Sequence, residues 1–128
     1  MILDTCFLID VLRGKEEVED LEKELEERSL SVSSVSVMEL WEGIHSVDSS
    51  HGEKQVVKKL LEQLKDAEFG KETAKKAGKI SAELQQDGLS IEIEDIMIAA
   101  TALENKETVV TGNDKHFERI EDLELKTY

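Results

Sequence analysis

The sequence predicts an α/β protein in which helices flank a central, mainly parallel sheet on both sides, a three-layer α/β/α arrangement. Short apolar segments alternate with amphipathic segments of ten or more residues, which are long enough to be crossover helices between parallel strands. The segment 108–111 contains only Thr and Val, which is typical of a strand buried on both faces. A chain of 128 residues is long enough for one ordinary domain, so we expect residues 1–128 to form a single domain.

The first half of the chain is expected to contain two strands and four helices. Residues 1–3 form an apolar strand, and the helix that follows stops at Gly14. Residues 30–33 alternate like a second strand, Ser34 or Ser36 caps the third helix, and a polar loop at 49–52 precedes the fourth. The apolar stripes expected to be buried on the second to fourth helices are Val18, Leu21 and Leu25; Val37, Leu40, Trp41, Ile44 and Val47; and Val56, Val57, Leu60, Leu61 and Leu64.

The second half is expected to add three strands and three helices. One of these helices contains an unusually apolar run from Ile96 to Leu103, so it must be central to the core. Gly88 ends the helix before it. The strands are expected at residues 67–69, 108–111 and 123–127, and the helices at 72–86, 94–103 and 115–120.

Composition excludes several classes of protein. No apolar run approaches the ~20 residues of a membrane span, and the chain opens directly on a strand, so we expect a cytoplasmic protein without a membrane association. The single cysteine, Cys6, cannot build a disulfide framework and is most simply a small buried residue. The histidines at 45, 51 and 116 have no ligand spacing with one another or with Cys6, which argues against zinc.

The charge is strongly negative but unevenly distributed. Sixteen Lys and Arg face thirty Asp and Glu, a formal net charge of −14, whereas nucleic-acid binding usually rests on basic residues. Residues 15–28 have a net charge of −5, whereas residues 54–79 hold eight lysines against four acids. Those lysines form either an ordinary solvated helix surface or a positive face for phosphate, and the sequence leaves both interpretations open.

Three acidic residues lie in unusually apolar surroundings. Asp4 follows an apolar strand, Glu39 stands between apolar residues with Gly43 one turn later, and Asp95 opens the apolar central helix. Each acid has a simple structural alternative, because a carboxylate near a helix start caps free N–H groups or interacts with the helix dipole. If the three acids converge instead, their mutual repulsion favours shared protons or a bound divalent cation, and oxygen ligands of this kind suit Mg²⁺ or Mn²⁺.

A parallel sheet also predicts where such a site would lie. Ligands bind outside the carboxyl ends of the strands, which directs attention to Asp4 and to Asn113 and Asp114, just after the strand at 108–111.

Four motifs follow one another along the chain. They are Ile2-Leu3-Asp4-Thr5; Ser36-Val37-Met38-Glu39 with Gly43; Asp95-Ile96-Met97-Ile98-Ala99-Ala100-Thr101-Ala102; and Val110-Thr111-Gly112-Asn113-Asp114-Lys115-His116-Phe117. Together these motifs resemble a PIN domain, and their spacing resembles the VapC-type toxins of prokaryotic toxin–antitoxin pairs. The resemblance covers essentially the whole chain.

The resemblance implies an endoribonuclease that depends on Mg²⁺ or Mn²⁺, with a cognate antitoxin as partner and a homodimer as assembly. It places Asp4, Glu39 and Asp95 in an acidic site, with Asp4 and Asp95 as direct metal ligands. The fourth ligand position, or fourth corner of the site, is open between Asn113, Asp114 and mainly water, because His116 stands where relatives with Asn often carry an Asp.

Other classes fit the residues less well. A response-regulator receiver needs an early acidic pair and a late Lys, and a haloacid-dehalogenase phosphatase needs a second Asp two positions after Asp4, where this chain has Cys6. The remaining alternative is a catalytically silent PIN-like binding or interaction module. If the chain binds RNA, the basic residues expected to line the path are Arg13, Lys75, Lys76, Lys79 and Lys115.

Overall fold

The computed structural model describes residues 1–48 and 50–128. Its strands are β1 (Ile2–Leu3), β2 (Ser31–Ser33), β3 (Lys65–Ala67), β4 (Val109–Thr111) and β5 (Leu125–Thr127). Its helices are α1 (Thr5–Leu12), α2 (Glu16–Leu25), α3 (Ser34–Ser46), α4 (His51–Glu62), α5 (Lys71–Gln86), α6 (Ile93–Asn105) and α7 (Asp114–Phe117). No helix among these residues is long and apolar enough to cross a membrane.

The five strands form one sheet in the order β3-β2-β1-β4-β5, and every neighbouring pair is parallel. The chain builds outward from β1 to β3 on one side, then returns to place β4 and β5 on the other. The strand order therefore reverses between β1 and β4, where parallel sheets open a crevice beyond their carboxyl ends. Ile2 of β1 pairs with Ser31 of β2 and with Val109 of β4, which puts the ends of these three strands at one edge.

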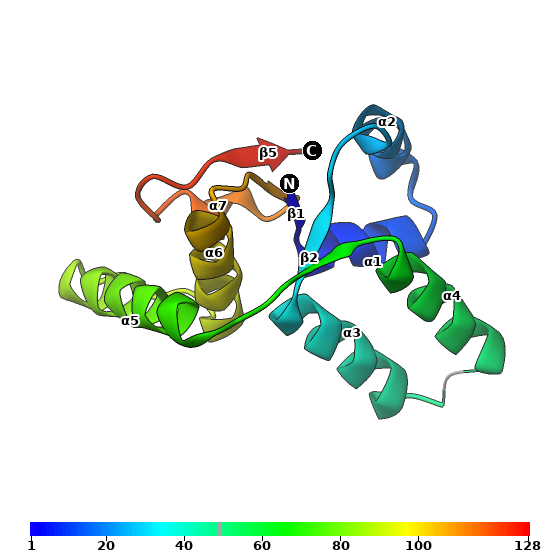
Figure 1. Ribbon diagram of the computed structural model, residues 1–128, viewed down its shortest axis with the longest axis horizontal. Helices are drawn as coiled ribbons and strands as arrows, with labels where there is room; N and C mark the ends of the chain where they lie inside the picture. The colour runs from blue at the N-terminus through cyan, green and yellow to red at the C-terminus, as the bar shows by residue number, and fades with distance from the viewer. Residues whose placement is uncertain (49) are drawn as a thin grey trace.

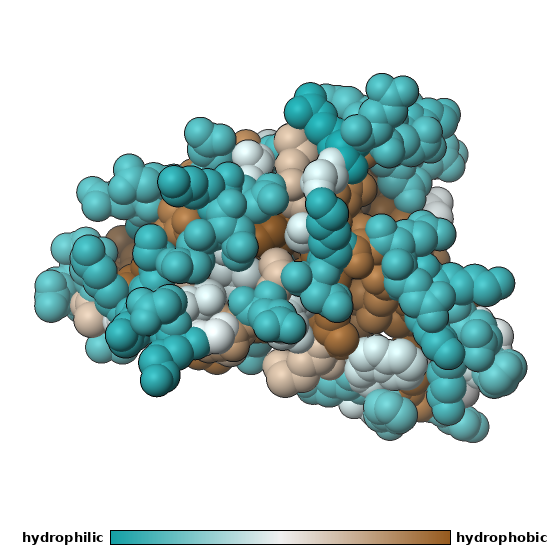
Figure 2. All heavy atoms as spheres, viewed as in Figure 1, coloured by the Kyte–Doolittle hydropathy of each residue, from teal (hydrophilic) through white to brown (hydrophobic). Residues whose placement is uncertain are grey.

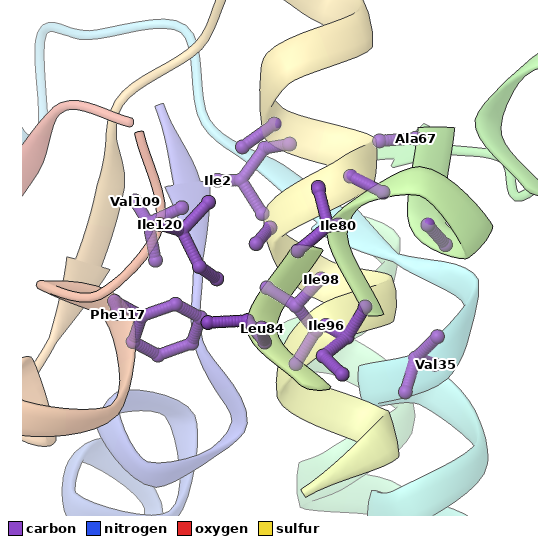
Figure 3. Packing of buried hydrophobic residues seen from close by; sticks show 14 residues of the cluster. Ile2, Val35, Ala67, Ile80, Leu84, Ile96, Ile98, Val109, Phe117 and Ile120 are labelled. Carbon is purple, nitrogen blue, oxygen red and sulfur yellow. The ribbon is translucent and has the colours of Figure 1, made fainter. Parts of the chain in front are cut away.

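Each face of the sheet is covered by its own group of helices (Figure 1). Ile2 and Val109 point into a core shared with α5, α6 and α7, where Phe117 is fully buried (Figure 3). Leu3 and Val110, the next residues of the same strands, point into the opposite core with α1 to α4. This alternation is the two-residue period of a strand buried on both faces, and it confirms the predicted three-layer fold.

Local signals account for several helix boundaries. Gly14 and Gly88 have φ angles of +66° and +70°, a conformation that glycine adopts without strain, and each lies just beyond a helix end. Ser50 caps α4 in a capping box with Glu53, whereas Ser49, part of the expected loop, lies outside the described residues. The cap of α3 is Ser33, not Ser34 or Ser36, because β2 runs directly into the helix and its last residue is extended.

Three further expectations about packing were wrong at particular residues. The third strand is Lys65–Ala67 rather than 67–69, because an edge strand paired only with β2 can expose polar residues. Val47 is 64% exposed because it follows α3 in an extended conformation and leaves the helical face. Val56 is 55% exposed because α4 buries one face only, and the adjacent Val57 occupies it.

Candidate active site

Asp4 is buried at the point where β1 ends and α1 begins. Its Oδ1 accepts the backbone N–H of Thr5 at 2.8 Å, so the carboxylate caps α1. Its Oδ2 accepts the Thr111 hydroxyl at 2.7 Å and the Cys6 thiol at 3.0 Å. The side chain is therefore held by three donors although the residue is only 3% exposed. Cys6 itself is half-buried and serves as one of these donors rather than as core filling.

Glu39 projects from the second turn of α3 and accepts a hydrogen bond from Thr5, the residue after Asp4. The Thr5 hydroxyl lies 2.8 Å from Oε1 of Glu39 and 2.9 Å from the Ser36 hydroxyl, so strand end and helix are joined by side-chain oxygens. Burial raises the pKa of Glu39, and the negative charges of Asp4 and Asp95 add to this rise, whereas the hydrogen bond from Thr5 opposes it. The Cβ position of Gly43, one turn later, faces open space.

Asp95 lies in the first turn of α6 with its side chain 14% exposed. The fully buried Ala99 and Ala102 follow it on the helix and allow close packing of α6. Burial raises the pKa of Asp95, and the charge of Asp4 adds to the rise, whereas a hydrogen bond from His116 opposes it. The Oδ2 atom of Asp95 is 2.7 Å from Nδ1 of His116.

These three acids are close enough for their charges to interact, yet they do not form a compact coordination group. Asp4 raises the pKa of both Glu39 and Asp95. Within residues 1–48 and 50–128, no three His, Cys, Asp or Glu side chains are arranged tightly enough to hold a metal ion as they stand. The donor set nevertheless fits a hard divalent cation, because it consists of desolvated carboxylates whose repulsion such a cation would relieve.

The structure treats the two candidates for the fourth corner differently. The backbone N–H of Asn113 donates to the Thr111 hydroxyl at 2.9 Å, and Nδ2 of Asn113 lies 3.0 Å from Nδ1 of His116. Asp114 is the first residue of α7, and its carboxylate forms no hydrogen bond or ion pair with the described residues. Asn113 is therefore the residue brought into contact with the group around Asp95.

Sequence reasoning assigned no role to His116, Thr5 or Thr111. The only sequence signal for His116 is its position, three residues after Asn113 and next to Phe117. Phe117 is buried in the structure, and its packing brings His116 to the sheet edge. The two threonines lie at the carboxyl ends of β1 and β4. There the Thr5 hydroxyl donates to Glu39 and the Thr111 hydroxyl donates to Asp4. Their partners are 34 and 107 positions distant in the chain, so spacing alone could not reveal them.

The basic residues expected on an RNA path do not form one group. Lys75 lies 3.2 Å from Glu72, and Lys79 lies 4.0 Å from Glu83, both as exposed pairs along α5. Lys76 and Lys79 line a hollow that also contains acidic residues and Arg119 but none of the site acids. Arg13 is exposed after α1 and lines a shallow hollow with Gly43. Lys115 is exposed on α7, next to His116.

The model of one protein family matches residues 1–123, and that family is described as the PIN domain. The chain belongs to the PIN domain family. The match includes all four motifs on which the predicted resemblance rested, and that prediction is confirmed.

Among curated proteins, this PIN-domain chain is similar to Ribonuclease VapC1 of Methanocaldococcus jannaschii, with 30% identity across all of this chain and 86% of the relative. It is also 28% identical to the tRNA(fMet)-specific endonuclease VapC of Salmonella typhimurium, over 99% of this chain and 96% of the relative. The predicted enzyme class, a ribonuclease of the VapC type, is the class named for these relatives.

Solved structures agree with this assignment. The VapBC2 structure from Rickettsia felis, bound to a promoter DNA fragment, aligns with a TM-score of 0.90 at 25% identity, over 99% of this chain and 97% of that one. The DNA-bound VapBC structure from Salmonella typhimurium aligns with a TM-score of 0.89 at 28% identity, over 98% of this chain and 96% of that one.

Proposed function

We propose that this PIN-domain chain is a divalent-metal-dependent endoribonuclease that cleaves RNA phosphodiester bonds and acts as the toxin of a VapBC-type toxin–antitoxin pair. The observation that carries the proposal is the position of Asp4, Glu39 and Asp95 at the reversal point of the sheet, where burial and neighbouring negative charges raise the pKa of Glu39 and Asp95. PIN-domain VapC nucleases are generally divalent-metal dependent, which supports this use of the acids.

Asp4 and Asp95 would hold the cation, Mg²⁺ or Mn²⁺, with Glu39 beside them. A bound divalent cation offsets charge on the scissile phosphate and activates water near neutral pH. Thr111 and Cys6 keep Asp4 in one orientation, while Thr5 holds Oε1 of Glu39 and leaves Oε2 able to accept a proton from water. Asn113 would complete the fourth corner through its contact with His116, and Asp114 remains a second candidate for that corner.

RNA phosphates would meet repulsion from so acidic a chain unless local positive charge and the cation offset it. The basic residues proposed to guide RNA are the five already described: Arg13, Lys75, Lys76, Lys79 and Lys115. Of these, Lys115 is closest in the chain to the site residues, since it lies between Asp114 and His116.

A cognate antitoxin is the proposed protein partner. The similarity to solved VapBC complexes supports it, as does an apolar groove between α1, α2 and α4, lined by Phe7, Val11 and Leu64 among others. Figure 2 shows hydrophobic residues exposed beside α4 on a face that is otherwise mostly hydrophilic. The charged side chains that line the same groove are Glu19, Glu22, Lys23, Glu26 and Arg28. The groove therefore suits a protein with apolar and mixed charged side chains better than RNA, which offers only negative phosphates.

The remaining features follow from the family rather than from contacts. We propose that residues 1–128 act as one nuclease domain, that two copies form a homodimer, and that the protein works in the cytoplasm, where it would meet cellular RNA. Light scattering coupled to gel filtration would report the assembly directly.

RNA cleavage by the purified chain tests the proposed activity. Cleavage should require added Mn²⁺ or Mg²⁺ and stop in EDTA, and Asp95→Asn should reduce it at least ~100-fold while preserving the fold, because the amide keeps shape and removes charge. Glu104→Gln, an exposed acid at the other end of α6, is the matched control and should retain most activity. A folded wild-type chain that neither binds Mn²⁺ nor cleaves RNA would instead be a silent PIN-like interaction module.

A further inference from the structure

We propose that His116 is a positioning residue of this site: its Nδ1–H holds Oδ2 of Asp95 and leaves Oδ1 as the oxygen that binds the divalent cation. The inference rests on the proposed metal-dependent function and adds to it a residue outside the predicted acidic set. It also gives a role to His116, which is not a carboxylate but stands at the position where relatives often carry an Asp.

The geometry determines the direction of the hydrogen bond. Nδ1 of His116 lies 2.7 Å from Oδ2 of Asp95. An ionised carboxylate can only accept, so Nδ1 must carry the proton that it shares with Asp95. An Nδ1 that donates has no lone pair left to accept from Nδ2 of Asn113, so the 3.0 Å contact with Asn113 is not a second hydrogen bond of that nitrogen.

The backbone that carries His116 is held in place by the core. Phe117, the next residue, is fully buried in the cluster that contains Ile96 and Ile98 of α6. The backbone N–H of His116 also bonds to the carbonyl of Asn113 at 3.3 Å. The same hydrophobic packing therefore positions α7 against the helix that carries Asp95, and His116 spans the gap between them.

Asp95 needs such support more than Asp4 does. Asp4 is fixed by Thr5, Cys6 and Thr111, whereas the His116 contact is the side-chain hydrogen bond that Asp95 forms among the described residues. Without it, no other side-chain hydrogen bond among the described residues would fix the orientation of the Asp95 carboxylate. Partners that orient metal-ligating side chains commonly contribute about 10–100-fold to metal affinity.

The competing role is direct ligation, since the His116 side chain is 38% exposed and its Nε2 is not used by Asp95. The two roles differ in what can replace the imidazole. An asparagine places its Nδ2–H close to the position of Nδ1–H and can still donate to Asp95. Its side chain ends short of the position of Nε2, the atom through which a ligating imidazole would bind.

Mn²⁺ affinity, measured by electron paramagnetic resonance of the free ion with full-length metal-free protein, tests the proposal without relying on catalysis. His116→Ala should weaken Mn²⁺ binding about 10–100-fold, and His116→Asn should restore most of it. His45→Ala removes an exposed histidine that stacks on Trp41 of α3, and should leave the affinity unchanged. Combining His116→Ala with Asp95→Asn should weaken binding no further than Asp95→Asn alone, because the two residues act through one carboxylate.

Circular dichroism and thermal melting identify variants that fail to fold, and His116→Asn keeps the test valid if His116→Ala does so. Unchanged affinity in a folded His116→Ala protein would overturn the positioning role while leaving the proposed function intact. Equal losses in the Ala and Asn variants would assign His116 as a direct ligand and also overturn it. A wild-type chain that binds no Mn²⁺ would overturn the proposed function together with this inference.

Discussion

Asp4 and Asp95 lie at the same edge of the sheet, but the protein surrounds them differently. Asp4 is almost completely buried and accepts hydrogen bonds from a backbone amide, a hydroxyl and a thiol. Asp95 is more exposed and is held by His116, and burial together with the charge of Asp4 raises its pKa. Glu39 resembles Asp95, with one hydrogen bond from Thr5 and a raised pKa.

The difference separates two tasks. The donors around Asp4 make its carboxylate a structural part of the β1–α1 junction as well as a candidate ligand. Asp95 and Glu39 carry charges that the folded chain disfavours, and these are the charges that a divalent cation would compensate. We therefore expect removal of Asp4 to affect stability and removal of Asp95 to affect metal binding and catalysis.

The largest expected effect is the loss of stability on removing Asp4. Asp4→Ala leaves the Thr5 amide and the Thr111 hydroxyl without their buried acceptor, and should lower the free energy of unfolding by about 2–4 kcal/mol. Asp95→Ala should cost less than ~1 kcal/mol in the metal-free protein, because it also removes a disfavoured charge. Urea unfolding in EDTA at pH 7 measures both, and equal losses would contradict the division of tasks.

Cation binding should have the next largest effect on stability. Mn²⁺ at a hundred times its dissociation constant should add about 2.7 kcal/mol to the free energy of unfolding, since it binds the folded site and relieves carboxylate repulsion. The melting temperature should rise with Mn²⁺ and return with EDTA in the wild type. The rise should be largely absent in Asp95→Asn, and a wild-type melting temperature indifferent to Mn²⁺ would argue against the acidic site.

In the metal-free protein, the pH dependence of stability should differ between the wild type and the Asp95→Asn variant. A carboxyl whose pKa is higher in the folded than in the unfolded state retains a proton in the folded state that the unfolded state has lost. Wild-type stability, relative to Asp95→Asn, should therefore fall as pH rises from the ordinary Asp pKa of about 3.9 through the raised value. Paired urea titrations from pH 3.5 to 7 in EDTA measure this difference, which would be flat if the Asp95 pKa were the same in both states.

The smallest expected effect concerns lysines remote from the acids. Charge removal at Lys75, Lys76 and Lys79 together should weaken RNA binding and reduce the log–log salt slope by about 0.7 for each single-strand phosphate that these lysines neutralise. Fluorescence anisotropy in the Asp95→Asn background keeps the RNA intact.

The matched control for those lysines is the equivalent triple change on α4, at Lys54, Lys58 and Lys59. If both triple variants behave like the parent protein, the α5 lysines are solvated helix surface. Guidance of RNA would then fall to Arg13 and Lys115.

Much of the fold could be predicted because its signals are local. The apolar triplet before Asp4, the β-branched segment 108–111 and the apolar run from Ile96 each indicate the burial of their own segment. Errors occurred where burial depends on neighbours in space, as at the edge strand β3 and at Val56 on α4. In those cases the hydrophobicity of a residue did not indicate which face of its strand or helix the fold would bury.

The sequence by itself determined which acids lie at strand ends and helix starts, because an acid directly after an apolar strand falls at the carboxyl edge of a parallel sheet. Only the tertiary structure decided which side chains hold those acids. Thr111 reaches Asp4 because β4 pairs beside β1, and His116 reaches Asp95 because Phe117 packs α7 onto α6. Such contacts join residues that are far apart in the chain, and their geometry is set by strand order and core packing rather than by spacing along the sequence.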